Sequence, residues 1–199
     1  MHKHVLDHFK KVDPKLHAYA VQVGPVSLTS SSKHFIELCD AIISQQLSVK
    51  AGATIVGRFF DLFPKKTPLP KLVLEIAPEK LRAVGMSNAK VRYVRALAEA
   101  VEQKLVDLAA LDQMSDEEVI ATLTKVKGIG VWTAEMFLIF TLGREDVFSA
   151  GDLGLRRAIQ KIYGLKTEPT PKKLFTLSKK WAPYRSYASR VLWKSLELK

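Results

Sequence analysis

The sequence predicts an all-α protein. Apolar residues recur at intervals of three and four along almost the whole chain, which is the spacing of the buried face of a helix. No segment alternates apolar and polar residues over more than a few positions, so strands are not expected. Pairs typical of helix N-termini, such as Asp13 with Pro14 and Ser115 with Glu118, precede these apolar patterns. The 199 residues suffice to bury one substantial core, or two smaller subdomains.

The first half of the chain carries helix signals separated by proline and glycine. Asp13 and Pro14 are typical of an N-cap and a first helical position, and Gly24 is a suitable end for that helix. The stretch PKKTPLP should break the chain, and Ser87 should cap a long helix. In order, we expect helices over about 14–24, 33–46, 49–63 and 88–103, with a short turn over 78–85.

The second half is organised around a glycine hairpin. Ser115 and Glu118 predict a capping box for a helix that ends at KGIG, and Val131 begins the next helix. A Gly-x-Gly turn, made by Gly128 and Gly130, therefore joins two helices. Further helices are expected over about 132–142, 152–163, 171–178 and 184–196.

The charge balance favours a polyanionic partner. Lys and Arg outnumber Asp and Glu by 31 to 20, which gives a net charge of +11. Such an excess attracts nucleic acid by releasing condensed counterions, although it would also suit an anionic membrane surface. No apolar run approaches the roughly 18 to 20 residues of a membrane span, and the first residues lack the apolar stretch of a signal peptide. We therefore expect a soluble intracellular protein.

The composition argues against disulfide and metal chemistry. The single cysteine, Cys39, excludes an internal disulfide, a four-cysteine iron–sulfur cluster and a cysteine-based zinc site. Its surroundings, FIELCDAII, predict a small buried hydrophobic residue. The five histidines have no acidic partners at metal spacing, and we interpret them as surface residues. No cofactor is expected to be required.

The hairpin glycines suggest an anion site. Glycine at 128 and 130 should let the backbone turn with positive φ angles and leave the N–H groups of the following helix uncovered. Those donors and the positive end of the helix dipole favour a phosphate, and Lys125 and Lys127 add positive charge. An ordinary turn between two helices would also contain GIG, so these residues alone leave both interpretations open.

Several separated blocks over residues 33–195 resemble one family. VKGIGVWTAEMFLIF is similar to the helix-hairpin-helix of DNA-repair glycosylases, and FSAGDLGLRRA resembles the Gly/Pro-rich loop with its aspartate. HFIELCDAIISQQLSVKAGATIVGRFF, LRAVGMSNAKVRYVRALAEAV and WAPYRSYASRVLW look like parts of the alkylation-repair branch, 3-methyladenine DNA glycosylase II. The resemblance implies one glycosylase domain of two helical subdomains with the active cleft between them. These would be residues 33–146, and 1–32 together with 147–199.

The resemblance also implies a catalytic Asp152. Cleaving an N-glycosidic bond builds positive charge on C1′, and a carboxylate there stabilises that charge or orients the attacking water. Which role dominates stays open, and Asp152 is also a suitable N-cap for the helix that follows. In bifunctional glycosylase/lyases, a lysine two residues after the second hairpin glycine forms a Schiff base with C1′. Trp132 stands there instead, so we expect a monofunctional enzyme that uses water and leaves an abasic site.

Substrate and DNA contacts follow from the same resemblance. Trp132 and Trp193 match positions that line the damaged-base pocket, and Met136 stands where some members carry a tyrosine. Aromatic faces favour purines that alkylation has made cationic, so 3-methyladenine and 7-methylguanine are the expected substrates. Family members can hold a structural monovalent cation on hairpin carbonyls, which by position are Thr124, Val126 and Ile129. The residues expected to contact DNA are Gly128, Gly130, Thr133, Lys127, Gln46, Met86, Ser87 and Asn88.

The expected partner is double-stranded DNA with a damaged base, bound by a monomer. No membrane partner is expected. Its location would be the cytoplasm or nucleoid of a bacterium or archaeon, or the nucleus of a eukaryote. One alternative is a glycosylase for another lesion, such as ethenoadenine or hypoxanthine. Another is a DNA-binding protein that kept the hairpin and lost the chemistry, which the retention of Asp152 argues against.

Overall fold

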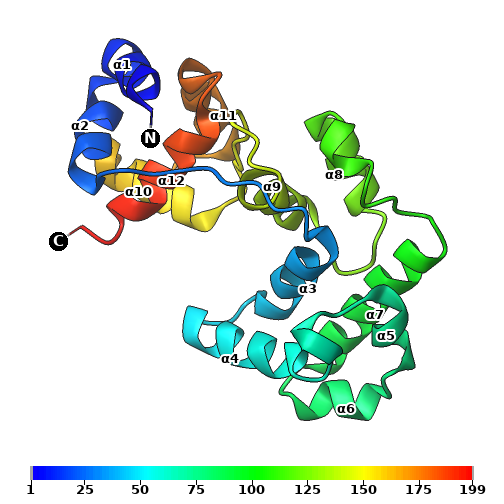
Figure 1. Ribbon diagram of the computed structural model, residues 1–199. Coiled ribbons are helices and arrows are strands. Elements are labelled where there is room, and N and C mark those ends of the chain that lie inside the picture. Colours follow the sequence, from blue (N-terminus) through cyan, green and yellow to red (C-terminus); the bar gives the residue numbers. More distant parts are fainter. Residues whose placement is uncertain (1, 199) are drawn as a thin grey trace. The chain divides into compact units, whose positions relative to one another are not determined.

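The structure, a computed structural model, describes residues 2–198 and contains helices but no strand in that range (Figure 1). The all-α prediction is therefore confirmed. The chain forms two compact units. The first unit comprises the described residues up to Ser30 and from Leu138 onward, and the second unit is Ser31–Phe137. No helix within 2–198 is long and apolar enough to cross a membrane.

The first unit joins both ends of the chain. Helix α2 packs against α1 and α12, and α12 also packs against α10, so residues far apart in sequence share one core (Figure 1). Trp181 and Phe9 are the largest side chains that are fully buried there. The helices of this unit are α1 (Lys3–Val12), α2 (Pro14–Val23), α10 (Leu153–Tyr163), α11 (Pro171–Ser178), the 3-10 turn η3 (Lys179–Trp181) and α12 (Arg185–Ser195).

Asp13 connects three parts of this unit. Its Oδ1 accepts from the Leu16 N–H at 3.2 Å and caps α2, as the Asp-Pro signal predicted. Its Oδ2 accepts from Trp181 Nε1 at 2.8 Å and from the Tyr163 hydroxyl, and Lys180 Nζ lies 2.8 Å away. Burial alone would raise the pKa of Asp13, but the donors from Lys180, Tyr163, Trp181 and Leu16 together lower it. Asp13 is therefore a charged structural residue.

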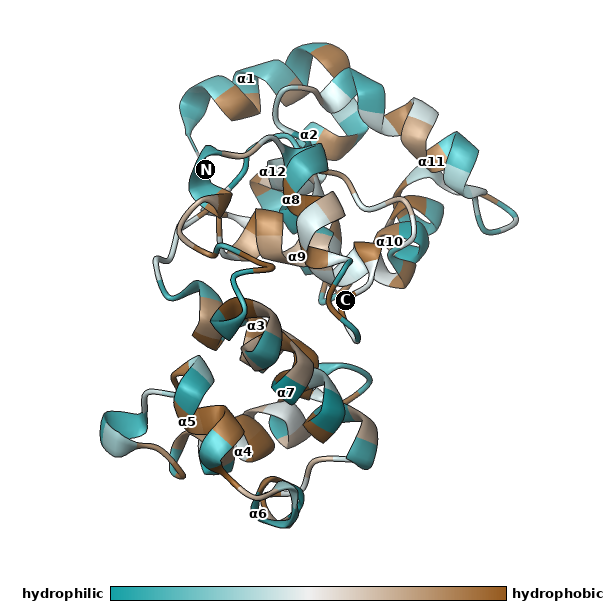
Figure 2. Cartoon of the chain, turned by 90° about the vertical axis from the view of Figure 1, so that its right-hand side faces the viewer, coloured by the Kyte–Doolittle hydropathy of each residue, from teal (hydrophilic) through white to brown (hydrophobic). Residues whose placement is uncertain are grey.

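The second unit is built around α3 and α7. Helix α3 packs against α4 and α7, and α5 packs along α7. Helix α9 (Val131–Phe140) begins in this unit and crosses into the first unit after Phe137. Most of α9 has the colour of apolar residues in Figure 2, consistent with its sequence VWTAEMFLIF. The other elements are α3 (His34–Ser44), α4 (Val49–Phe60), η1 (Pro64–Lys66), α5 (Pro70–Glu75), α6 (Pro78–Ala83), α7 (Asn88–Glu102), η2 (Leu111–Gln113) and α8 (Asp116–Leu123).

Helix α5 was not predicted, and the predicted exposure of His34 was wrong. The stretch PKKTPLP breaks the chain after α4 as predicted, but its last residue, Pro70, begins the short helix α5, where its missing N–H costs nothing. His34 is buried rather than exposed: its Nδ1 lies 2.8 Å from the Leu108 carbonyl oxygen, and its Nε2 lies 3.4 Å from Asp112. Cys39 is buried as expected, and burial raises the pKa of its thiol.

The division into units differs from the predicted subdomain boundaries. The second unit begins at Ser31 rather than at residue 33, and it ends at Phe137 rather than at 146. The segment after Phe137 belongs with the first unit because its contacts are there. The Glu145 carbonyl accepts from the Ser186 N–H at 2.9 Å, and the Val147 N–H donates to Ser186 Oγ at 2.9 Å. The predicted cleft between subdomains stays a prediction.

Candidate functional site

The hairpin between α8 and α9 turns at Gly128. Its φ of 100° lies in the left-handed region, which other L-residues rarely adopt. A Cβ added to Gly128 would lie 2.2 Å from Cγ of Tyr93, so both backbone and packing demand glycine. The capping box predicted at the other end of α8 is present, with Glu118 Oε2 accepting from the Ser115 N–H at 2.8 Å. The helix-hairpin-helix prediction is confirmed.

Gly130 has a different role from the one predicted. Its φ is outside the left-handed region, and a Cβ there would meet no atom within 4 Å. The prediction of a positive φ at this position was therefore wrong. Its carbonyl accepts from the Ala134 N–H at 3.0 Å, in the first turn of α9. Gly130 is exposed, so the missing side chain leaves the surface open at the start of this helix.

Gln45 holds the hairpin from the end of α3. Its Nε2 donates to the Gly128 carbonyl at 3.0 Å and to Thr133 Oγ1 at 3.2 Å. The Gln45 amide is therefore satisfied by the hairpin backbone and by a neighbouring hydroxyl. Thr133 is buried and its hydroxyl accepts from Gln45. The contact of Thr133 with DNA stays a prediction. Lys125 and Lys127 are exposed beside the turn.

Trp132 lies on the second unit as an exposed indole. Its side chain is 45 % exposed, and its neighbour Val131 is also exposed. Trp132 is therefore not a core residue. Met136, one turn further along α9, is half-buried. An exposed aromatic face at the start of a helix can stack on a planar ligand.

Asp152 is fixed at the start of α10 in the first unit. It is the N-cap of that helix, and its Oδ1 accepts from the Leu155 N–H at 2.7 Å and from Trp193 Nε1 at 2.9 Å. Asp152 is only 8 % exposed. Two donors on one oxygen hold this buried carboxylate in one orientation, as a group that acts on a reacting atom requires.

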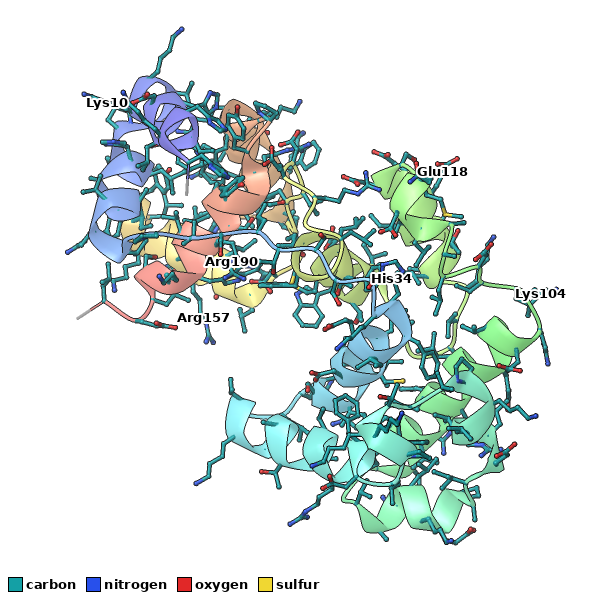
Figure 3. All side chains as sticks on the ribbon, in the orientation of Figure 1. Lys10, His34, Lys104, Glu118, Arg157 and Arg190 are labelled. Atoms are coloured by element: carbon teal, nitrogen blue, oxygen red, sulfur yellow. The ribbon has the colours of Figure 1, made fainter. Side chains whose placement is uncertain are left out.

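Three further residues order this site, and the sequence analysis did not single them out. The ring of Phe140 stacks on Trp193 with centroids 5.5 Å apart, and the Arg190 guanidinium lies 4.9 Å from the centroid of Phe140. Arg190 comes from α12, as Figure 3 shows. A Cβ on Gly154 would lie 3.0 Å from Cδ1 of Trp193 and 3.1 Å from Oδ1 of Asp152. The one sequence signal was a glycine inside a predicted helix, in DLGLRRA.

The hairpin and Asp152 both lie within the residues that match a known protein family. The sequence profile described as "HhH-GPD superfamily base excision DNA repair protein" matches residues 39–183, more than half of the chain. The chain belongs to the HhH-GPD superfamily of base excision DNA repair proteins.

Relatives within the HhH-GPD superfamily cover nearly all or most of the chain. The DNA-3-methyladenine glycosylase 1 of Schizosaccharomyces pombe is 37 % identical over 164 residues, which is 81 % of this chain and 72 % of that protein. An alkylbase DNA glycosidase-like protein of the same yeast is 33 % identical and covers 97 % of this chain and 93 % of its own. A structure of the yeast 3-methyladenine DNA glycosylase in complex with abasic DNA superimposes with a TM-score of 0.91, at 33 % identity over 98 % of both chains.

Like Thr133, a second residue predicted to contact DNA in this HhH-GPD protein is buried. Met86 is 1 % exposed and packs in the core of the second unit, and its carbonyl accepts from Arg82. The side chain of Met86 is therefore not available for the predicted contact with DNA. Ser87 caps α7, with its Oγ accepting from the Lys90 N–H at 3.2 Å, and it is exposed together with Asn88.

Exposed apolar residues, which were not predicted from the sequence, lie around the start of α4. Gln46 is exposed with a φ of 57°, in the left-handed region that costs energy for a residue with a side chain. Leu47 and Val49 on either side of Ser48 are also exposed, Val49 at 92 %. The sequence SQQLSV contained a signal for this exposed pair, because Leu47 and Val49 flank Ser48, a residue typical of a helix N-cap.

The hairpin carbonyls predicted to hold a cation lie in the turn after α8. Thr124 is the C-cap of α8, and the Val126 carbonyl accepts from the Ile129 N–H at 3.0 Å. A carbonyl has two lone pairs, so this bond leaves Val126 able to act as a ligand. Within residues 2–198, no group of three His, Cys, Asp or Glu side chains could hold a metal ion. Carbonyl oxygens are ligands for hard cations rather than for soft metals such as Cu(I), and the cation at this turn stays a prediction.

Proposed function

We propose that this protein is a monofunctional DNA glycosylase that hydrolyses the N-glycosidic bond of alkylated purines in double-stranded DNA. The observation that carries the proposal is Asp152, a buried carboxylate held in one orientation at the start of α10. Relatives of the superfamily named DNA-3-methyladenine glycosylase support the assignment of substrate class. The expected products are a free base and an abasic site.

The reaction needs a negative charge near the sugar. In our proposal the bond between C1′ and the purine nitrogen breaks, and its electron pair leaves with the base. The Asp152 carboxylate stabilises the positive charge that develops on C1′. A water oxygen then bonds to C1′ and loses a proton. Because the base must leave the stack to reach such a group, the nucleotide is rotated out of the duplex.

Trp132 distinguishes this chemistry from that of a lyase. An indole has no nucleophilic amine, so it cannot form the Schiff base that the lysine of a bifunctional enzyme forms. Borohydride added during turnover should therefore trap no protein–DNA adduct. Strands should break only after alkali or an abasic-site nuclease. A trapped adduct that disappears in Asp152→Asn would contradict monofunctionality.

The preference for alkylated purines follows from an aromatic face that can stack on a base, with no side chain assigned to protonate the leaving base. Trp132 offers an exposed indole on which a cationic base can stack, and the half-buried Met136 lies one turn along the same helix. Alkylation at a ring nitrogen makes the base a good leaving group without protonation. We therefore propose that 3-methyladenine and 7-methylguanine are released faster than neutral lesions.

We propose that DNA is held by a monomer through the exposed parts of the second unit. Backbone N–H groups beside Gly128 and Gly130, with Lys127, would bind phosphates in any sequence. Gln46, between the hairpin-bonded Gln45 and the exposed Leu47, is a second contact. Ser87 and Asn88 add exposed polar groups at the start of α7. A structural monovalent cation on the Thr124, Val126 and Ile129 carbonyls would stabilise the turn, and no other cofactor is proposed.

The deciding experiment is a panel of duplexes that each contain one lesion. Single-turnover release should be fastest for 3-methyladenine and 7-methylguanine, and it should be slow for ethenoadenine, hypoxanthine and uracil. Asp152→Asn should release none of them at a comparable rate. Preferred release of neutral hypoxanthine would contradict the alkylpurine assignment and leave a glycosylase for another lesion. Binding without release of any base would leave a DNA-binding protein.

A further inference from the structure

Trp193 and Asp152 are joined by a short contact inside the first unit. The indole Nε1 donates to Oδ1 of Asp152 at 2.9 Å, and the Leu155 N–H donates to the same oxygen at 2.7 Å. One donor belongs to the helix that Asp152 caps, and the other comes from α12. Two donors from different elements on one oxygen limit the rotation of the carboxylate more than a helix cap alone would.

The indole is itself held in place. Its ring stacks on Phe140 at an interplanar angle of 29°, and the Arg190 guanidinium covers Phe140. Its pyrrole edge lies against Gly154, where a Cβ would approach Cδ1 to 3.0 Å and Nε1 to 3.1 Å. Few real Cβ contacts are this close, so any larger residue at 154 would displace the indole or the carboxylate. Glycine here provides space for a side-chain contact, since its φ is ordinary.

We propose that Trp193 is a positioning residue that holds Asp152 in its reactive orientation, and that Gly154 provides the clearance for this contact. The inference rests on the proposed function. It differs from the role that the family resemblance implies for Trp193, which is to line the base pocket. In the present assignment Trp132 receives the base, whereas Trp193 acts through the aspartate.

A double-mutant cycle separates the two roles. Trp193→Phe keeps an aromatic ring on Phe140 and removes the N–H donor. Single-turnover release of 7-methylguanine should slow by about 10- to 100-fold, the range for one hydrogen bond to a charged group, with the Kd for DNA unchanged. In the Asp152→Asn background, Trp193→Phe should change the rate no further. Slowing by the same factor in both backgrounds would assign Trp193 to base stacking and overturn the proposal, as would a wild-type rate for Trp193→Phe.

The first unit supplies a matched control. Trp181 donates through Nε1 to Asp13 at 2.8 Å, close to the 2.9 Å between Trp193 and Asp152. Trp181→Phe should lower the Tm but leave the rate per folded molecule unchanged. Gly154→Ala should slow release about as much as Trp193→Phe, whereas Gly57→Ala, in the open on α4, should not. Normal release by a folded Gly154→Ala variant would contradict the clearance role.

A readout without catalysis tests the contact itself. The Trp193 indole N–H should give a downfield nuclear magnetic resonance signal that exchanges slowly with solvent, and Asp152→Ala should shift it and speed its exchange. The other indole signals should move little. An unshifted signal would overturn the proposal whatever the enzyme releases. A wild-type protein that releases no lesion, but whose signal shifts as expected, would contradict the proposed function and leave the contact intact.

Discussion

Asp13 and Asp152 are both helix N-caps in the first unit, but we assign them different roles. Each is a buried N-cap, and each accepts a hydrogen bond from a tryptophan indole, Trp181 for Asp13 and Trp193 for Asp152. At Asp13 the indole, the Tyr163 hydroxyl and the Lys180 ammonium all meet Oδ2. At Asp152 the indole and the helix N–H meet on Oδ1, and a glycine lies against that oxygen.

The difference shows what separates a structural carboxylate from a candidate catalytic one. Asp13 is 3 % exposed, and its charge is neutralised by an ion pair that links α2 to η3. Such a group stabilises the fold and cannot also reach a substrate. The orientation of Asp152 is fixed by a backbone N–H and an indole N–H, on a loop-to-helix junction within the matched family region. Both residues are helix N-caps, so their roles are separated by partners from elsewhere in the chain.

The largest expected effect comes from Asp152→Asn. Removing the charge should slow base excision several hundredfold or more, roughly 3 to 4 kcal/mol of transition-state stabilisation. Stability should change little, because Asn caps helices about as well as Asp. Single-turnover assays with a parallel melting curve and a DNA-binding titration measure all three quantities. Near-normal excision by the folded variant would remove Asp152 from the mechanism and erase the contrast with Asp13.

The hairpin offers the same contrast between two glycines. Gly128→Ala forces a side chain into the left-handed region and into Tyr93, so the free energy of unfolding should fall by about 2 to 4 kcal/mol. Gly130→Ala, whose Cβ meets nothing, should leave stability unchanged and weaken binding to all duplexes alike. Urea titrations and salt-dependent DNA binding measure these effects. Equal stability of the two variants would show that the turn is not as tight as described.

Asp13→Asn should have the opposite profile to Asp152→Asn. At neutral pH it should lower the free energy of unfolding by about 1.5 to 3 kcal/mol, because bonds to a charged acceptor are lost, and leave the excision rate of the folded fraction unchanged. The pKa of Asp13 is lowered in the folded state, so its contribution is present above its unfolded pKa and lost as pH falls through the folded one. The stability difference between wild type and variant in urea titrations should therefore begin to shrink as the pH falls below about 4, the ordinary pKa of an aspartate. A difference that does not change with pH would argue against an ionised Asp13.

The smallest expected effect, that of Trp132→Ala, separates the role of the Trp132 indole from that of the Trp193 indole. Trp132→Ala removes an exposed side chain, so the Tm should stay within a degree or two of wild type. The activation free energy for release of cationic bases should rise by about 1 to 3 kcal/mol, the contribution of one stacked base. Unlike Trp193→Phe, this loss should persist in the Asp152→Asn background. Rates for two lesions, compared in both backgrounds, provide the check.

The sequence by itself determined the helical class, most helix spans, the capping box at Ser115 and the glycine at the hairpin turn. These features depend on neighbours within a few residues, and periodicity, caps and turn chemistry report such neighbours directly. The Asp152 candidate came from a family resemblance on contiguous residues, so it too was visible along the chain. Cys39 was predicted to be buried for the same local reason, its apolar surroundings.

Only the tertiary structure decided how the site is held. Gln45 reaches the hairpin over a separation of 83 residues, and Trp193 reaches Asp152 over 41. The need for glycine at 154 depends on that second contact and cannot be deduced from the helix that contains it. Met86 was misjudged because the packing beneath a turn, rather than the turn sequence, determines whether a side chain points outward. Hydrogen bonds and close packing between distant segments depend on three-dimensional proximity, which no local pattern encodes.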